Sequence, residues 1–143
     1  MLNKILSFFL NRYNKLDNNN FYYLSLIKEG EDEWSIHGLW PQNSSTTYPS
    51  YCKKVDFDIN KIKSLINLLN KYWYSDRVQD YDFWKHEWEK HGSCMFEEID
   101  EYNYFNKTIE LYEFVIKNVN IDKYYNNKNK KCLIPFDLNF NLM

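Results

Sequence analysis

The sequence contains no run of about 20 apolar residues, the length that a helix needs to cross a membrane, so we expect no membrane span. It also lacks an excess of basic residues, because 18 lysines and arginines stand against 20 acidic residues and give a formal net charge of −2. Proteins that hold long nucleic acids by overall charge carry a strongly basic face. Any contact of this chain with nucleic acid should therefore be short and local.

Cysteine is also rare, with only Cys52, Cys94 and Cys132 in the chain. This odd number allows at most one internal disulfide and leaves one thiol without a partner in the chain. The first residues resemble a secretory signal only weakly, because their apolar run is short and the polar residues that follow offer no small-residue cleavage site. We therefore treat residues 1–20 as a weakly signal-like or flexible N-terminal segment.

The remaining composition is that of a globular protein. Apolar residues make up 44% of the 143 residues and aromatic residues 20%, which is a supply of large side chains that disordered chains lack. The length fits a single domain, which we place at residues 1–143. A domain of this size buries roughly two-thirds of the surface of its unfolded chain, so it can hold a true core.

Strand-like patterns lie at both ends of the chain. Residues 21–27 and 33–37 have the apolar or alternating character of strands, and residues 132–140 can supply a last strand. Residues 41–49, rich in Asn, Ser and Thr between two prolines, predict a loop. Strands at both ends around a block of helices predict an α+β domain.

Helical patterns fill the middle of the chain. Apolar spacing predicts helices over residues 59–72, capped by Asp58, and over residues 83–91, ended by Gly92. A third helix is predicted over residues 100–118. The side chains of this third helix that we expect to face inward are Tyr104, Ile109, Tyr112, Val115 and Ile116.

All three histidines lie in two short windows, residues 34–42 and residues 83–94. The same windows hold four of the five tryptophans and two of the three glycines, which a random scatter of rare residues would not produce. Taken alone, His37 would more often be a structural residue than a catalytic one. The second window favours the catalytic interpretation.

Histidine ionises near neutral pH, so two imidazoles that face one substrate can act as an acid and a base, each worth roughly 10²–10⁴-fold in rate. Residues four apart on a helix share a face, as His86 does with Lys90 and Glu87 with His91. These two faces are adjacent. The second window therefore projects two imidazoles, a carboxylate and an ammonium toward one region.

This combination suits the cleavage of an RNA phosphodiester by transesterification. A base takes the proton of the ribose 2′-hydroxyl, an acid protonates the leaving 5′-oxygen, and a cation stabilises the charge that builds on the phosphate. The substrate supplies the nucleophile, so the chemistry needs no metal, no other cofactor and no activated serine. DNA lacks the 2′-hydroxyl, and we expect it to be inert.

The segments IHGLWP (residues 36–41) and FWKHEWEKHGSC (residues 83–94) resemble the two active-site segments of the ribonuclease T2 family, in the same order. The resemblance is densest over residues 21–121. It implies a small antiparallel β-sheet packed with about three main α-helices, reduced at both ends. It also implies a metal-independent endoribonuclease that cleaves single-stranded RNA through 2′,3′-cyclic phosphates to 3′-phosphates.

The resemblance also implies roles for the polar residues of the two windows. His37 would be the general acid and His91 the general base. Glu87 and Lys90 would stabilise the pentacovalent phosphorane, and His86 would help to hold the phosphate. These five residues are the expected catalytic set.

Further residues are implied to bind the substrate or to hold the fold. Trp40 resembles the family's base-stacking tryptophan, and Gln42 and Tyr48 fall where other residues of the base pocket lie. A disulfide between Cys52 and Cys94 is implied, and closing this loop would contribute about 4 kcal/mol in the chain-entropy description. The family further implies a secreted or endolysosomal protein, and we expect a monomer.

Two other functions are open at this point. Glu87 and the histidines on either side of it superficially resemble a zinc-protease helix, but that motif has its histidines four apart rather than five. Zinc could still be held by His37, His86, His91 and Cys94. Alternatively, a shortened homologue of the same fold could bind RNA or another partner without cutting it.

Simpler interpretations also exist for several of these residues. Trp40 could be a core residue instead of a platform for a base, and Glu87 with Lys90 could be a plain surface pair worth a few tenths of a kcal/mol. The remaining tryptophans of the two windows, which we expect in the core, are Trp34, Trp84 and Trp88.

Overall fold

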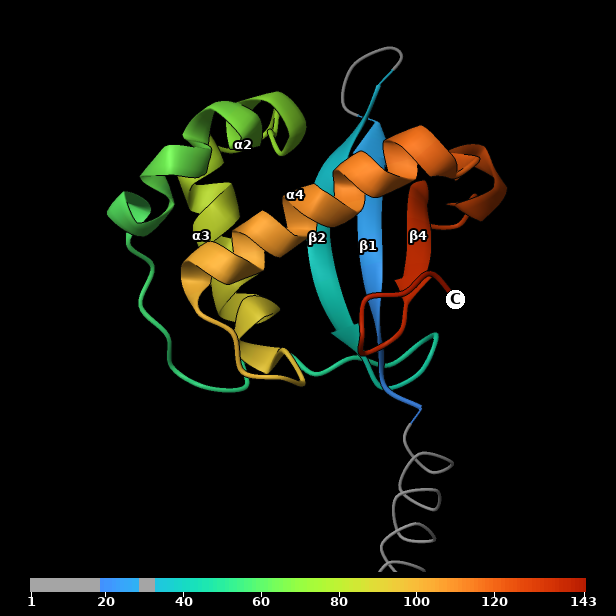
Figure 1. The fold of residues 1–143 in the computed structure, drawn as a ribbon, viewed down its shortest axis with the longest axis horizontal. Coiled ribbons are helices and arrows are strands. Elements are labelled where there is room, and N and C mark those ends of the chain that lie inside the picture. Colours follow the sequence, from blue (N-terminus) through green and yellow to red (C-terminus); the bar gives the residue numbers. More distant parts are fainter. Residues whose placement is uncertain (1–18, 29–32) are drawn as a thin grey trace, which may run out of the picture.

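A computed structural model describes residues 19–28 and 33–143, so most of the signal-like segment at residues 1–20 lies outside the described residues. Within these ranges the chain forms one sheet and a set of helices (Figure 1). With 3-10 helices labelled η, the elements in order are β1 (Phe21–Lys28), β2 (Trp34–Gln42), η1 (Ile59–Leu65), α2 (Ile66–Tyr72), α3 (Asp80–Lys90), η2 (Gly92–Cys94), α4 (Glu101–Asn118), η3 (Ile121–Tyr124), β3 (Tyr125–Asn126) and β4 (Lys131–Phe136).

The sheet is antiparallel, with the strand order β2-β1-β4-β3. Strand β1 therefore has hydrogen-bonded neighbours on both sides, and its Leu24 pairs with Leu39 of β2 and Ile134 of β4. All three of these side chains are fully buried. The predicted α+β class, with a small antiparallel sheet and about three main helices, is confirmed.

Helix α4 crosses one face of this sheet, while α2 and α3 lie beyond its β2 edge (Figure 1). Two tyrosine hydroxyls fix the crossing. Tyr104 donates a hydrogen bond of 2.9 Å to the carbonyl oxygen of Leu39, and Tyr112 donates one of 2.8 Å to that of Trp34. Since both acceptors belong to β2, these bonds hold α4 against the strand that carries the first histidine window.

Strand β2 is longer than the sequence predicts. The pattern suggested a strand over residues 33–37 and a loop over residues 41–49, but pairing with β1 continues as far as Gln42, which lies opposite Phe21. Proline is tolerated at position 41 because β2 is an edge strand, where one side of the backbone needs no partner. The loop therefore begins only after Gln42.

The last strand is shorter than predicted and gains a small partner. Strand β4 ends at Phe136, because Asp137 accepts a hydrogen bond from the backbone of Asn141 and turns the chain back. The expected strand over residues 132–140 therefore stops four residues early. The two-residue strand β3, which the sequence pattern does not reveal, pairs with the start of β4.

The predicted helices occur with adjusted limits. Asp58 caps the first one by accepting a hydrogen bond of 2.9 Å from the backbone of Asn60, but that helix begins as a 3-10 helix and becomes α-helical only at Ile66. Helix α3 begins at Asp80, three residues before the predicted start. In α4 the inward position expected for Ile116 is wrong, since this side chain is 48% exposed.

Tryptophan side chains of the core donate hydrogen bonds to backbone carbonyl oxygens. Trp84 and Trp88 are buried as predicted, whereas Trp34 is only partly buried. Trp73, which is fully buried, donates a hydrogen bond of 3.0 Å to the carbonyl oxygen of His37, and Trp84 donates one to the carbonyl oxygen of Trp73. The core therefore holds the backbone of the first histidine in place.

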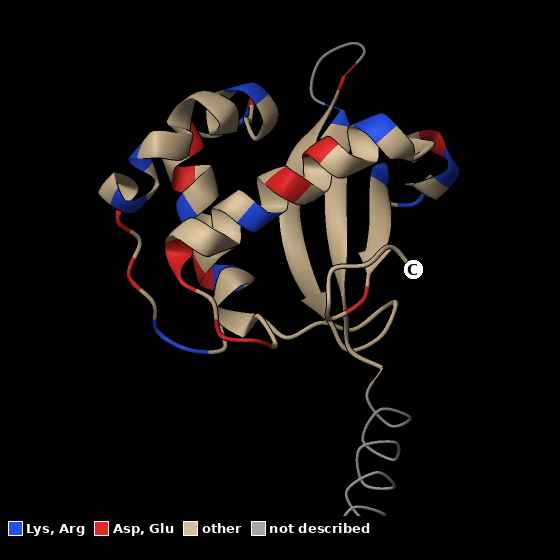
Figure 2. Cartoon of the chain, viewed as in Figure 1, with Lys and Arg blue, Asp and Glu red and all other residues tan. Residues whose placement is uncertain are grey.

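The disulfide implied by the family resemblance joins Cys52 to Cys94, while Cys132 is a free, buried thiol. Figure 2 shows acidic and basic residues mixed along the helices in this view, with neither sign dominating. This matches the balanced composition of the chain. No helix in the described ranges combines the length and the apolar character needed to cross a membrane.

Candidate active site

The carboxylate of Glu87 lies between the two imidazoles that the sequence singles out. Its Oε1 atom is 3.3 Å from Nε2 of His37, and its Oε2 atom is 3.6 Å from Nε2 of His91. The indole N–H of Trp40 donates a hydrogen bond of 3.1 Å to Oε2. The side chain of Glu87 is 1% exposed, so one buried carboxylate links both histidine windows.

Strand β2 approaches helix α3 closely because residue 38 is a glycine. A Cβ atom at Gly38 would lie 2.6 Å from Oε2 of Glu87 and 2.5 Å from Nε1 of Trp40, which is closer than real Cβ atoms come to other heavy atoms. Because Gly38 has no side chain, the carboxylate of Glu87 can pack directly against the strand.

The side chains of the second window lie on two adjacent faces of helix α3, as their spacing predicts. Glu87 and His91 share one face, and the backbone N–H of His91 still donates to the carbonyl oxygen of Glu87 at the C-terminal end of the helix. His86 is exposed on a neighbouring face, where its Nδ1 atom lies 3.5 Å from the hydroxyl of Tyr51. The ammonium of Lys90 lies 5.6 Å from the ring centroid of Tyr48.

The buried setting gives Glu87 and His91 different protonation behaviour. Burial raises the pKa of Glu87, but the hydrogen bond with His37, the charges of His91 and His37, and the N–H of Trp40 outweigh it and lower the pKa overall. Burial lowers the pKa of His91 to about 4, against the opposing effect of the charge on Glu87. At neutral pH the site therefore combines an ionised carboxylate with a neutral imidazole at His91.

Two of the three residues expected to bind a base lie against His91. The indole of Trp40 stacks on the imidazole, with ring centroids 5.0 Å apart, and the ring of Tyr48 lies at 5.9 Å. Tyr48 is 50% exposed. Gln42 is elsewhere: it is buried, and its amide donates to the carbonyl oxygen of Ser44, so in this structure it braces the loop after β2.

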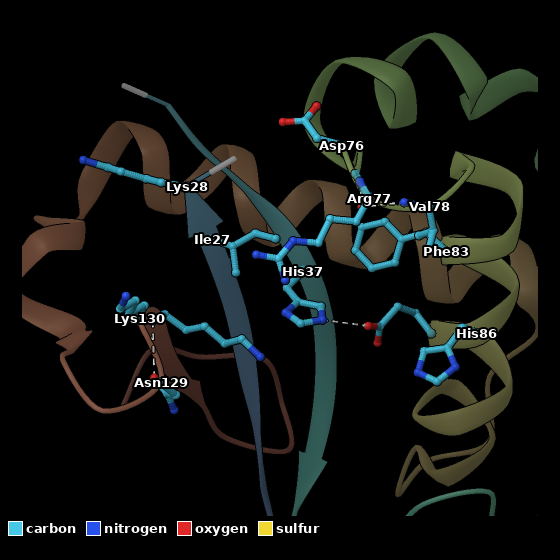
Figure 3. Close-up of a pocket in the computed structure, with 13 residues that line it drawn as sticks. Ile27, Lys28, His37, Asp76, Arg77, Val78, Phe83, His86, Asn129 and Lys130 are labelled. Carbon is cyan, nitrogen blue, oxygen red and sulfur yellow. Dashed lines mark hydrogen bonds and ion pairs between the residues drawn. The ribbon is translucent and has the colours of Figure 1, made fainter. Parts of the chain in front are cut away.

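A cleft of about 630 Å³ opens beside the carboxylate, and its size is within the range of small-ligand sites. His37, His86 and Glu87 form part of its wall, whereas His91 does not. Figure 3 shows His37 in the middle of the cleft, with its ion pair to the carboxylate drawn as a dashed line. The other lining residues are Ile27, Lys28, Ser75, Asp76, Arg77, Val78, Phe83, Asn129, Lys130 and Lys131.

The basic residues of this cleft are not apparent from the sequence. Lys28, Arg77, Lys130 and Lys131 come from three separate parts of the chain, and none belongs to a histidine window. In Figure 3, Lys130 lies on the opposite side of His37 from His86. The only signal in the sequence is the pair of adjacent lysines where the last strand begins, and such a pair usually marks a solvated turn.

The zinc site considered from the sequence is not formed. Cys94 is in a disulfide and has no thiolate to offer a metal. Among residues 19–28 and 33–143, no group of three or more His, Cys, Asp and Glu side chains is arranged to hold a metal ion. Both oxygens of Glu87 already face protein groups, His37 on one side and His91 on the other.

Residues 10–131 match the sequence model of the Ribonuclease T2 family. Ribonuclease DdI of Dictyostelium discoideum is 42% identical over 83 residues, which are 57% of this chain and 37% of that protein. Ribonuclease T2 of Sus scrofa is 37% identical over 100 residues, or 64% of this chain and 48% of that protein. The chain thus spans about half or less of the length of these relatives.

The fold also has close counterparts among solved structures. A mutant of ribonuclease MC1, a protein from bitter gourd seeds, was solved in complex with 5′-GMP and superposes with a TM-score of 0.67. The superposition covers 86% of this chain and 91% of that one, at 22% sequence identity. The two chains therefore share a fold, although few of their residues are identical.

Proposed function

This chain belongs to the ribonuclease T2 family, and from that membership we propose that it is an endoribonuclease that cleaves single-stranded RNA without a metal ion. The observation that carries the proposal is the placement of His37 and His91 on the two oxygens of one buried carboxylate. Two imidazoles held this close can act on the two ends of a single phosphodiester.

In the first step, His91 acts as the general base. Burial keeps its imidazole neutral at neutral pH, which is the form that accepts a proton. The proton comes from the ribose 2′-hydroxyl, whose oxygen then attacks the phosphorus. Glu87, whose Oε2 atom is 3.6 Å from Nε2 of His91, stabilises the imidazolium that results.

His37 acts as the general acid on the opposite side of the carboxylate. It lines the cleft, and its Nε2 atom lies 3.3 Å from Oε1 of Glu87. It donates a proton to the leaving 5′-oxygen, which releases one strand and leaves a 2′,3′-cyclic phosphate. In the second step the two histidines exchange roles, and water opens the ring to a 3′-phosphate.

Charged and polar side chains near the two histidines bind and stabilise the reacting phosphate. Lys90 supplies a cation for the negative charge of the phosphorane, and Glu87 supports it by keeping both imidazoles oriented. His86 lines the cleft and is exposed, so it can contact the bound phosphate.

The two nucleotides that flank the scissile phosphate bind on opposite sides of Glu87. The nucleotide that carries the attacking hydroxyl stacks its base on Trp40 and Tyr48, which lie next to His91. The nucleotide that leaves occupies the cleft next to His37. Gln42 completes the base pocket only if it releases its hydrogen bond to the backbone of Ser44.

DNA, which lacks the attacking hydroxyl, is not cleaved. The chain acts as a monomer, because one chain supplies every residue of the site.

One observation favours a second function. His91 is only 4% exposed and is flanked by Trp40 and Tyr48, which would suit a protein that binds RNA without cutting it. Incubating the protein with single-stranded RNA in excess EDTA separates the two functions. Cleavage supports the nuclease, and tight binding with the RNA intact supports the binding protein.

A further inference from the structure

Lys131, the first residue of β4, carries an ammonium that lies 5.0 Å from the ring centroid of Trp40. Lys90 is placed in a similar way over Tyr48, at 5.6 Å. These two aromatic rings lie next to His91. One ammonium from the second histidine window and one from the far end of the chain therefore lie against the two aromatic rings that flank His91.

Lys131 also belongs to the cleft. It lines the cleft together with His37 and Glu87, and its side chain is partly buried. Burial lowers the pKa of Lys131, while the carboxylate of Glu87 raises it and the ammonium of Lys90 lowers it further. Within residues 19–28 and 33–143, no carboxylate forms a salt bridge with it, so its charge is available to an anion in the cleft.

A turn rich in asparagine sets the position of Lys131. The backbone N–H of Lys130 donates to the carbonyl oxygen of Asn126 at 2.8 Å, and the side chain of Asn129 accepts from the backbone of Lys131 at 3.3 Å. Lys130 has a positive φ of 56°, which lets the chain turn sharply before β4 begins. Pairing of β4 with β1 then fixes the strand that carries Lys131.

We propose that the ammonium of Lys131 binds a non-bridging oxygen of the scissile phosphate and stabilises the charge that builds there in the transition state. This inference rests on the proposed nuclease function and adds a cation from outside both histidine windows. A base that stacks on Trp40 displaces the ammonium from that ring. The phosphate attached to the same nucleotide is then the nearest anion that the substrate brings.

The test compares three variants with the wild type on a dinucleoside monophosphate that the wild type cleaves, in EDTA. Lys131→Met removes the charge, Lys131→Arg keeps it, and Lys128→Met is the control, since Lys128 is an exposed lysine of the same turn and does not line the cleft. Thermal unfolding of each variant verifies that it is folded.

We expect Lys131→Met to lower kcat by about 10²-fold with KM changed less than about threefold, as for the loss of a group that acts in the transition state. Lys131→Arg should keep kcat within about fivefold of the wild type, because the charge is retained. Lys128→Met should leave both constants unchanged. An unchanged kcat for Lys131→Met, or a rise in KM alone, overturns the role of Lys131 while leaving the nuclease function intact.

The two proposals fail in different ways. If the wild-type protein does not cleave any RNA, the nuclease function falls, and binding of inorganic phosphate, followed by calorimetry, then tests Lys131 alone. Weaker phosphate binding by Lys131→Met than by Lys128→Met supports the phosphate contact. Equal binding by the two variants overturns it.

Discussion

The Nε2 atom of His37, on strand β2, lies 3.3 Å from the Oε1 atom of Glu87, on helix α3. The sheet and the helix therefore meet at an imidazole and a carboxylate, although the two residues are far apart in the sequence. The other carboxylate oxygen faces His91, so Glu87 fixes the distance between acid and base.

Replacing either imidazole should remove most of the activity. We expect His37→Ala and His91→Ala each to lower kcat/KM for RNA by at least about 10²-fold, because each removes one partner of the acid–base pair. Steady-state cleavage of a short single-stranded RNA measures the effect, and circular dichroism verifies the fold. Normal turnover by either folded variant would refute the assignment of that residue.

Glu87→Gln and Lys90→Ala should affect the chemical step more than the binding of RNA. Gln keeps the shape of the side chain but removes the charge that pairs with both imidazoles, and Ala removes the cation near Tyr48. We expect kcat to fall by about 10-fold or more while the Kd for a non-cleavable 2′-O-methyl RNA changes little. A pure loss of binding would move these residues out of the transition-state role.

Gly38→Ala should damage the site without touching a catalytic residue. The added methyl group would overlap the carboxylate of Glu87 and the indole of Trp40. We expect a loss of about 1–3 kcal/mol in the free energy of unfolding, together with a lower kcat. In a Glu87→Ala background the same change should cost less stability, because one of the two overlapping groups is gone. Equal costs in the two backgrounds would mean that Gly38 does not make room for Glu87.

The dependence of kcat/KM on pH should be bell-shaped, with an unusually low acidic limb. His91 must be neutral to accept a proton, and its pKa is lowered to about 4 by burial, so the rate should fall only as pH drops through that value. The bell shape follows because the second imidazole must carry the proton that it donates to the leaving oxygen. An acidic limb near pH 6.5, measured in EDTA, would contradict the neutral state assigned to His91. A profile that is flat from pH 4 to pH 8 would contradict catalysis by an acid–base pair.

The disulfide should stabilise the segment that carries Tyr48. Cys52 and Cys94 are 42 positions apart, and closing a loop of this length contributes about 4 kcal/mol in the chain-entropy description. We expect the double variant Cys52→Ser, Cys94→Ser to lose a free energy of unfolding of this order in urea. Adding a reducing agent to the wild type should give the same loss, and a change below about 1 kcal/mol would show that the bridge matters little.

Much of the fold could be predicted because its local signals agree with its tertiary structure. The apolar run of β1, the Asp58 cap and the apolar stripe of α4 all lie where the pattern puts them. The errors arose where pairing or packing decided the outcome. Pairing with β1 extended β2 through a proline, and Ile116, one residue beyond the buried Val115, is rotated by about 100° away from the sheet.

The candidate site, like the fold, could be predicted only in part. Each of its two histidine windows is a continuous stretch of sequence, so the residue types and the helical spacing of Glu87 and His91 could be predicted. The cleft could not, because the topology of the sheet brings Lys131 next to a strand and a helix that lie far from it in the chain. Gln42 was expected in the base pocket, and its hydrogen bond to Ser44 depends on a loop conformation that residue types do not specify.

The most direct test uses an RNA oligonucleotide in which every ribose but one is 2′-O-methylated, incubated with the protein in excess EDTA and followed by mass spectrometry of the products. If His37 and His91 act across one phosphate, cleavage occurs only at the unmodified ribose and gives first a 2′,3′-cyclic phosphate and then a 3′-phosphate. An intact oligonucleotide, cleavage at methylated positions, or products with 5′-phosphate ends would contradict the account.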